Sequence, residues 1–299
     1  MKVIICCATD TKMAPLCSGL VASIRARIGN RHPIGLLDVG LDDGARDWFA
    51  GRVGQIVEPG WDIVWPPEVK GDPPPWYRAL TGRPFLPRHF PGYDIYLWID
   101  ADAWVQDGSV IDMLVDAAQH ADVAIVPEMH PAYSHHYDRG ETMRWMHDQY
   151  LYWFAGRMGS TYMYHPILNS GVFAARTGSP FWTAWAENYQ RGIDSQIERF
   201  GQIRDMNDQI PLNAAIYTCR LQTGLLPASC NFMLNKALPV YDPDRALFLD
   251  PCPPHAPLHV LHLSGKDKDK PRRVALHRRP GHLMSRIAFD PARRPGKAG

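Results

Sequence analysis

Two aspartates separated by one residue, Asp100-Ala101-Asp102, follow the strongest apolar strand pattern in the chain, Asp94 to Ile99. Ligands of open α/β sheets bind beyond the carboxyl ends of the strands, where both carboxylates are expected. Adjacent carboxylates repel each other unless a cation offsets their charge, and carboxylate oxygens suit magnesium and manganese. The same spacing recurs at 242–244 and 267–269, but not after a strong strand. The first pair therefore indicates a divalent metal site; the alternative is a turn cap beside a surface acid.

A histidine far along the chain offers a third ligand. His262 ends the apolar run that begins at Leu258, and Gly265 and Lys268 follow it with the spacing H-x-x-G-x-x-K. Imidazole suits manganese-like metals better than magnesium. A glycine lets the backbone approach a phosphate closely, and the Lys268 ammonium group would neutralise one. A histidine at a strand end is also common as an ordinary core or surface residue, and His259 in the same run serves as the comparison.

The elements that must hold these residues alternate between strand and helix. Strands are expected at 3–8, 34–39 and 55–58, and apolar residues at helical spacing lie between them. The first strand has no polar alternation, so it is expected to be buried on both faces. This rhythm predicts an α/β fold with a mostly parallel, Rossmann-like sheet and helices on both faces. Further strands are expected at 94–99, 123–126, 172–175 and 258–263, and helices at 111–118, 141–154, 181–189 and 208–217.

Composition narrows the function classes. The 299 residues suit one large domain or two, and a net charge of +1 gives no overall basic field for nucleic acid. The apolar runs are shorter than the ~20 residues that span a bilayer, and the start does not resemble a secretory signal. Six cysteines without a C-x-x-C pair suggest reduced residues of a cytoplasmic protein.

Charge and proline are unevenly distributed along the chain. Residues 266–299 contain eleven lysines and arginines against three aspartates, a net charge of +8, so the remaining 265 residues carry −7. This basic tail is expected to be a solvated terminus, a lid over a diphosphate, or a contact with an anionic membrane surface. Residues 65–92 contain eight prolines and are expected to form loop with short helical pieces.

Several short motifs together resemble those of the GT-A glycosyltransferases, and among these glycosyltransferase family 8. In chain order they are Ala8-Thr9-Asp10 (A-x-D), Arg83, Asp100-Ala101-Asp102 (D-x-D), Asn169-Ser170-Gly171-Val172 (N-[SA]-G-V), Asp208-Gln209 with Leu212-Asn213 (D-Q-x-x-L-N), and His262, Gly265 and Lys268. Each motif is short, but their order and spacing cover residues 8–268.

The resemblance implies a role for each matched position. Ala8, Thr9 and Asp10 would hold the nucleobase and ribose, and Arg83, Gly265 and Lys268 would face the diphosphate. The metal ligands would be Asp100, Asp102 and His262, with Ala101 between the first two. Asn169, Ser170 and Gly171 would lie beside the donor sugar, with Asp208 orienting its hydroxyls and Gln209 near the anomeric carbon.

The implied activity is metal-dependent transfer of a sugar, a hexosyl group, from a nucleotide sugar to an acceptor hydroxyl, with retention. A UDP-sugar is the favoured donor and manganese is favoured over magnesium. The acceptor would be a glycan, such as one of the cell envelope, a lipid-linked sugar or a small molecule, and the enzyme would be cytoplasmic, with peripheral contact at the inner face of the membrane as an option. Residues 1–268 would form one GT-A domain, 127–166 an acceptor-side insertion, and 269–299 the basic tail.

Two other functions stay open on the same residues. One is a carbohydrate- or nucleotide-binding protein that keeps the fold without turnover. The other is a sugar nucleotidyltransferase, which is disfavoured because the first strand is not followed by a glycine-rich phosphate loop.

The chain departs from the family pattern in two places. Thr11, Lys12 and Met13 stand where the family has acidic or amide and aromatic residues, which weakens the expectation of a ring stacked on uracil. The K-P-W ending is absent after Lys268.

The segment 127–166 matches no known motif. Its aromatic side chains are expected either to stack on acceptor sugars or to pack in the core; they are Trp145, Tyr150, Tyr152 and Trp153. Glu128 is expected to be a cap or to bind the acceptor. A second metal site on His130, His135, His136 and Asp138 is disfavoured, because they show no helical His pair and no cysteine.

Overall fold

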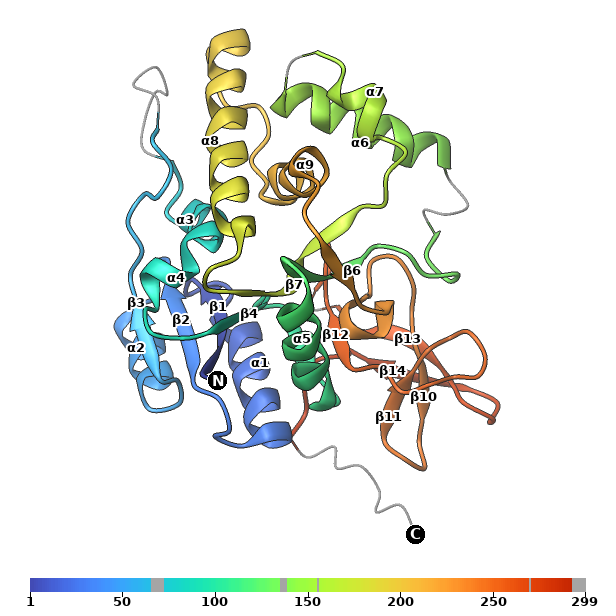
Figure 1. Ribbon diagram of the computed structural model, residues 1–299. Helices are drawn as coiled ribbons and strands as arrows, with labels where there is room; N and C mark the ends of the chain where they lie inside the picture. Colours follow the sequence, from blue (N-terminus) through green and yellow to red (C-terminus); the bar gives the residue numbers. More distant parts are fainter. Residues whose placement is uncertain (66–72, 135–138, 155, 269, 292–299) are drawn as a thin grey trace.

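The computed structural model describes residues 1–291 except 66–72, 135–138, 155 and 269, and residues 292–299 also lie outside the described part (Figure 1). A seven-stranded sheet forms the centre of the molecule. From edge to edge its strands are β3 (Gln55–Val57), β2 (Ile34–Asp38), β1 (Val3–Thr9), β4 (Ile95–Ile99), β7 (Leu168–Arg176), β6 (Val123–Pro127) and β8 (Thr223–Leu225). The two pairs that involve β7 are antiparallel and the other four are parallel, so the expected mostly parallel sheet is confirmed.

Helices cover both faces of this sheet. They are α1 (Ala14–Ile28), α2 (Asp43–Ala50), α5 (Ser109–His120), α6 (Arg139–Trp153), α8 (Pro180–Phe200) and α9 (Gln209–Cys219). Alternate residues of β1 enter different cores, as the two-residue period of a strand requires. Ile4 and Cys6 pack with apolar residues of α6, α8 and α9, whereas Ile5 and Cys7 pack with those of α1 and α5. The expectation that this strand is buried on both faces is therefore confirmed.

Local signals explain where several helices begin and end. Asp42 caps α2, its side chain accepting from the backbone N–H of Ala45 at 2.8 Å. Ser179 caps α8 in the same way, Pro180 occupies the first helical position, and Gly201 ends the helix in the left-handed conformation. The proline-rich segment forms the short helices α3 (Tyr77–Thr81) and α4 (Leu86–His89) around a 3-10 turn at Arg83–Phe85, as expected.

Two smaller sheets lie beside the central sheet, to the right of α5 in Figure 1. One contains β5 (Ala103–Val105), β12 (Val260–His262) and β9 (Phe232–Met233). The other contains β11 (Leu247–Leu249), β10 (Val240–Asp242), β13 (Arg272–Leu276) and β14 (His282–Ser285). Val274 and Ile287 are buried in a third core with Trp104 and Phe248. Residues 272–285 of the basic segment therefore form a packed hairpin rather than a solvated terminus.

The aromatic side chains of 127–166 divide between core and surface. Tyr150 and Trp153 on α6 are fully buried against α8 and α9, so the core interpretation holds for them. Trp145 and Tyr152 are partly exposed. The segment also contains the short helix α7 (Met158–Tyr162). No helix among the described residues is long and apolar enough to cross a membrane.

Candidate active site

The two aspartates lie at the junction between the central sheet and the β5-β12-β9 sheet. Asp100 directly follows β4, and its backbone N–H donates to Gly171 O at 2.8 Å, which ties it to β7. Asp102 directly precedes β5, and its carbonyl accepts from Leu263 N at 2.8 Å, just beyond β12. Both carboxylates and His262 are thus fixed by the backbone at the carboxyl end of β4, where ligands of α/β sheets bind.

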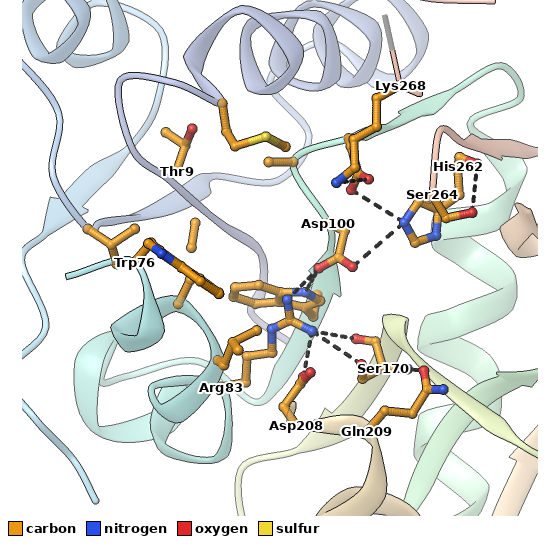
Figure 2. Close-up of a pocket in the computed structure, with 18 of the residues that line it drawn as sticks. Thr9, Trp76, Arg83, Asp100, Ser170, Asp208, Gln209, His262, Ser264 and Lys268 are labelled. Carbon is orange, nitrogen blue, oxygen red and sulfur yellow. Dashed lines mark hydrogen bonds and ion pairs between the residues drawn. The ribbon is translucent and has the colours of Figure 1, made fainter. Parts of the chain in front are cut away.

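A group of two carboxylates and one imidazole occupies this junction (Figure 2). His262 Nε2 lies 3.3 Å from Asp102 Oδ1 and 3.7 Å from Asp100 Oδ2. Burial lowers the pKa of His262, but the negative charges of Asp102 and Asp100 raise it by more. The pKa of His262 therefore lies above its ordinary value. Three ligand atoms that converge in this way fit a divalent metal such as manganese.

A hydrogen bond to Asn231 orients the imidazole of His262. Asn231 Nδ2 donates to Asn169 Oδ1 at 2.8 Å, so its Oδ1 accepts the Nδ1–H of His262 at 2.9 Å. The Nε2 atom then points at the two carboxylates and offers its lone pair when the ring is neutral. Metal-binding histidines are held in this way, by a partner on the ring nitrogen that does not bind the metal.

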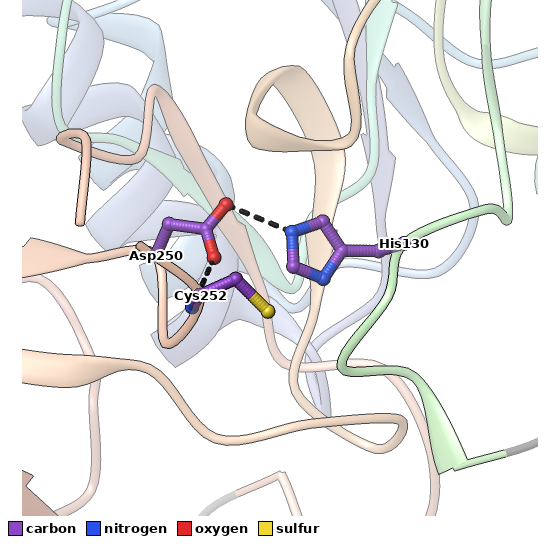
Figure 3. Close-up of side chains that lie close together, drawn as sticks. All are labelled: His130, Asp250 and Cys252. Carbon is purple, nitrogen blue, oxygen red and sulfur yellow. Dashed lines mark hydrogen bonds and ion pairs between the residues drawn. The ribbon is translucent and has the colours of Figure 1, made fainter. Parts of the chain in front are cut away.

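A second group, His130, Asp250 and Cys252, has the opposite arrangement (Figure 3). The backbone N–H of Ala132 donates to His130 Nδ1 at 3.1 Å, so Nε2 carries the proton that it donates to Asp250 Oδ2 at 2.8 Å. A neutral imidazole with that tautomer has no lone pair at Nε2 for a metal. Of the disfavoured second site, only His130 can be placed here, because His135, His136 and Asp138 lie outside the described residues.

Arg83 forms ion pairs with two aspartates, Asp100 and Asp208. Its Nη2 lies 2.7 Å from Asp100 Oδ1, and its Nη1 lies 2.6 Å from Asp208 Oδ2 (Figure 2). The guanidinium covers the ring of Trp98 at 4.6 Å. Burial lowers the pKa of Arg83, but the two carboxylates raise it more. Burial raises the pKa of Asp208 by more than the Arg83 charge lowers it. Arg83 and Asp208 therefore form a buried ion pair, in which removing either charge would leave the other one buried without a partner.

Lys268 provides a second cation on the opposite side. Its Nζ lies 2.8 Å from Asp102 Oδ2. Burial raises the pKa of Asp102, but His262 and Lys268 lower it more, so this carboxyl is held well below its usual range. Gly265 has a φ of +93°, and a Cβ there would lie 3.0 Å from Asn235 Cβ. The turn that brings Lys268 back to Asp102 therefore favours glycine.

A network of amides and one acid lies beyond Asp100. Asn169 Nδ2 donates to Glu128 Oε1 at 2.8 Å and to Gln209 Oε1 at 3.1 Å. Gln209 Nε2 donates to Glu128 Oε1 at 3.1 Å, and the Ser170 N–H donates to Gln209 Oε1 at 3.2 Å. Every member is buried or half-buried and has a partner, so the amide orientations are fixed before any ligand binds.

Most of these side chains line one cavity of about 490 Å³. Fourteen of the fifteen sequence-predicted site residues line it, namely Ala8, Thr9, Asp10, Arg83, Asp100, Ala101, Asp102, Asn169, Ser170, Asp208, Gln209, His262, Gly265 and Lys268. Gly171 lies directly behind it, where a Cβ would approach His262 Cε1 to 2.6 Å. Segments far apart in sequence thus converge on one site.

The chain resembles known proteins in structure but not detectably in sequence. No protein-family model matches the chain, and no curated protein matches it by sequence. The galactosyltransferase LgtC, solved in complex with donor and acceptor sugar analogues, matches with a TM-score of 0.53 over 88% of this chain and 87% of its own, at 14% identity. The chain has a GT-A glycosyltransferase fold.

Two further solved structures agree with this GT-A fold. An active-site mutant of LgtC matches with a TM-score of 0.53 at 14% identity, covering 88% of each chain. The apo structure of WbbM, a bifunctional glycosyltransferase, matches with a TM-score of 0.52 at 12% identity, over 89% of this chain and 46% of that one. The resemblance to glycosyltransferase family 8 that the motifs suggested is therefore matched by the fold.

Some residues of the GT-A cavity and its surroundings were not among the predicted site residues. Trp76 lines the cavity from a proline-rich segment with no periodic signal, and Lys12 and Met13 line it beside Asp10. Asn231 precedes a strand of two residues, too short for a sequence pattern. Glu128, for which the sequence leaves a cap or an acceptor-binding role open, accepts hydrogen bonds from the side-chain amides of Asn169 and Gln209.

Proposed function

We propose that this chain is a metal-dependent glycosyltransferase that moves a sugar from a nucleotide sugar to an acceptor hydroxyl. The observation that carries the proposal is the convergence of Asp100, Asp102 and His262 with two cations, Arg83 and Lys268, at the carboxyl end of β4. Carboxylates with an oriented imidazole suit a divalent metal, and flanking cations suit a diphosphate.

The residues divide the work around the bond that breaks. A divalent metal held by Asp100, Asp102 and His262, for which we favour manganese, would offset charge on the leaving diphosphate. The Lys268 ammonium would exchange the Asp102 carboxylate for phosphate oxygens, whereas the Arg83 guanidinium would add phosphate oxygens and keep its buried partner Asp208. The bond between the anomeric carbon and the diphosphate oxygen breaks, a bond to the acceptor oxygen forms, and the acceptor proton leaves with the diphosphate.

The polar network would position the sugar. Asp208 and Asn169 would orient its hydroxyls, and Gln209 would lie near the anomeric carbon. Glu128 connects this network to the segment 127–166, on which we place the acceptor. Retention, a UDP-sugar donor and a cell-envelope glycan or lipid-linked acceptor are parts of the same proposal and follow the family 8 resemblance.

The test is release of nucleoside diphosphate from a panel of nucleotide sugars with and without manganese. We expect manganese-dependent turnover of one nucleotide series and a loss of about 100-fold or more in Asp102→Asn, because several kcal/mol of charge stabilisation disappear. Asp244→Asn, an exposed acid of another Asp-x-Asp, is the matched control and should keep full activity.

Two results would overturn the proposal. Equal turnover in Asp102→Asn and Asp244→Asn would show that the acidic group is not the metal site. Nucleotide binding without turnover, with every sugar and acceptor mixture, would favour the binding-protein alternative instead.

A further inference from the structure

An indole ring lines one end of the donor cavity. Trp76 directly precedes α3, is 46% exposed, and lines the cavity together with Thr9, Lys12 and Met13. Figure 2 shows Trp76 on the same side as Thr9, away from His262 and Ser264 on the opposite side. The exposed face of this ring is a flat apolar surface beside the charged groups of the cavity.

The segment beneath Trp76 is held by its own contacts. The backbone N–H groups of Tyr77 and Arg78 donate to the carbonyls of Pro74 and Pro75 at 2.9 and 3.1 Å. The Tyr77 ring packs edge-on against the Trp76 ring, with centroids 4.4 Å apart. Since the prolines also restrict the backbone, the position of the Trp76 ring is fixed before a ligand binds.

The other aromatic residue that lines the cavity is already covered. Trp98 is 1% exposed, carries the Arg83 guanidinium over its ring, and stacks on Phe173. The positions after Asp10 are Thr11, Lys12 and Met13, so no ring follows the A-x-D motif. Among the described residues that line this cavity, Trp76 is therefore the aromatic side chain with exposed surface.

We infer that Trp76 stacks on the nucleobase of a nucleoside diphosphate donor, an assignment that rests on the proposed function. The charged middle of the cavity fits the diphosphate and the amide network fits the sugar. The nucleoside is then left to the end formed by Thr9, Asp10 and Trp76. Because every base has a π-face, this contact contributes affinity without selecting the base.

The test compares two probes in the presence of manganese, UDP and inorganic pyrophosphate, by calorimetry. Pyrophosphate carries the charge but no base. We expect Trp76→Ala to weaken UDP by about 5- to 150-fold, the usual range for one stacked base, and to leave pyrophosphate unchanged. Trp76→Phe should recover most of the loss. Trp48→Ala, which changes a half-buried tryptophan on α2 that does not line the cavity, should bind both probes like the wild type.

Each other outcome decides against the assignment. Unchanged UDP affinity in Trp76→Ala would overturn it, and equal weakening of UDP and pyrophosphate would show that the substitution disturbs the phosphate site. A loss seen with UDP-sugars but not with UDP would place the ring on the sugar. If the wild type binds pyrophosphate but no nucleoside diphosphate of any base, the proposed function itself fails.

Discussion

His262 and Asn231 are joined by a hydrogen bond of 2.9 Å on the side of the imidazole that faces away from the aspartates. Asn231 is 1% exposed, and its amide is itself fixed by Asn169. Removing it would free the ring to rotate and to change tautomer. The geometry of the acidic group therefore depends on a residue that contacts neither carboxylate.

We predict that Asn231→Leu weakens manganese binding by about 10- to 100-fold, the usual effect of losing the partner of a metal-binding histidine. The measurement is a titration of free manganese by electron paramagnetic resonance. The control is Asn188→Leu, which removes another buried asparagine; its side chain bonds to Ala184 and Arg191 of the same helix, α8. Equal manganese affinity in two folded variants would contradict the prediction.

Arg83 is predicted to be essential for stability, apart from any catalytic role. Arg83→Met leaves Asp208 buried without its cation, which costs about 3–5 kcal/mol of unfolding free energy. The double variant Arg83→Met/Asp208→Asn removes both charges and should be more stable than the single one. Urea unfolding in chelator compares them, and a double variant no more stable than Arg83→Met would show that the ion pair does not dominate.

Gly171 is predicted to be intolerant of a methyl group. A Cβ there would lie 2.6 Å from His262 Cε1 and 2.8 Å from both Asn169 Oδ1 and Asp100 Oδ2. Gly171→Ala should therefore lower stability by about 1–3 kcal/mol and weaken manganese binding as the ligands shift apart. A Cβ at Gly178, just beyond the same strand, meets nothing within 4 Å, so Gly178→Ala is the control. Two variants with equal melting temperatures would refute the steric argument.

The buried carboxyl of Asp205 predicts how the stability of the protein changes with pH. Burial raises its pKa from the ordinary 3.8, against the lowering effects of Trp153 and Asn207. Its neutral form is thus favoured by folding, and that contribution is present below about pH 3.8 and is lost as pH rises through the folded pKa. Asp205→Asn does not titrate, so the unfolding free energy of the wild type relative to the variant should fall as the pH rises from about 4 through the raised pKa of Asp205. A difference independent of pH in urea unfolding would exclude the effect.

Much of the sheet could be predicted because its inner strands are continuous apolar runs, and the segments between them have apolar residues at helical spacing. The Asp100–Asp102 strand end, His262 and Gly265 can be predicted from residue type and position, whereas Gly171 follows only from the family resemblance. Asn231 could not be found in this way, because it depends on β9 and β12 being neighbours, and β9 has two residues. The antiparallel direction of β7 also has no local signal. For Trp153 the sequence left two interpretations open, and only the packing of α6 on α8 decides between them.

The charges that line the cavity nearly cancel. Asp10, Asp100, Asp102 and Asp208 face Lys12, Arg83 and Lys268, and the two latter cations are already paired with carboxylates. Without a metal, such a surface projects little positive potential into solvent, so a nucleotide anion gains little long-range attraction toward it. A bound divalent metal would add two positive charges, so the association rate of the nucleotide should depend on ionic strength more steeply with manganese than in chelator.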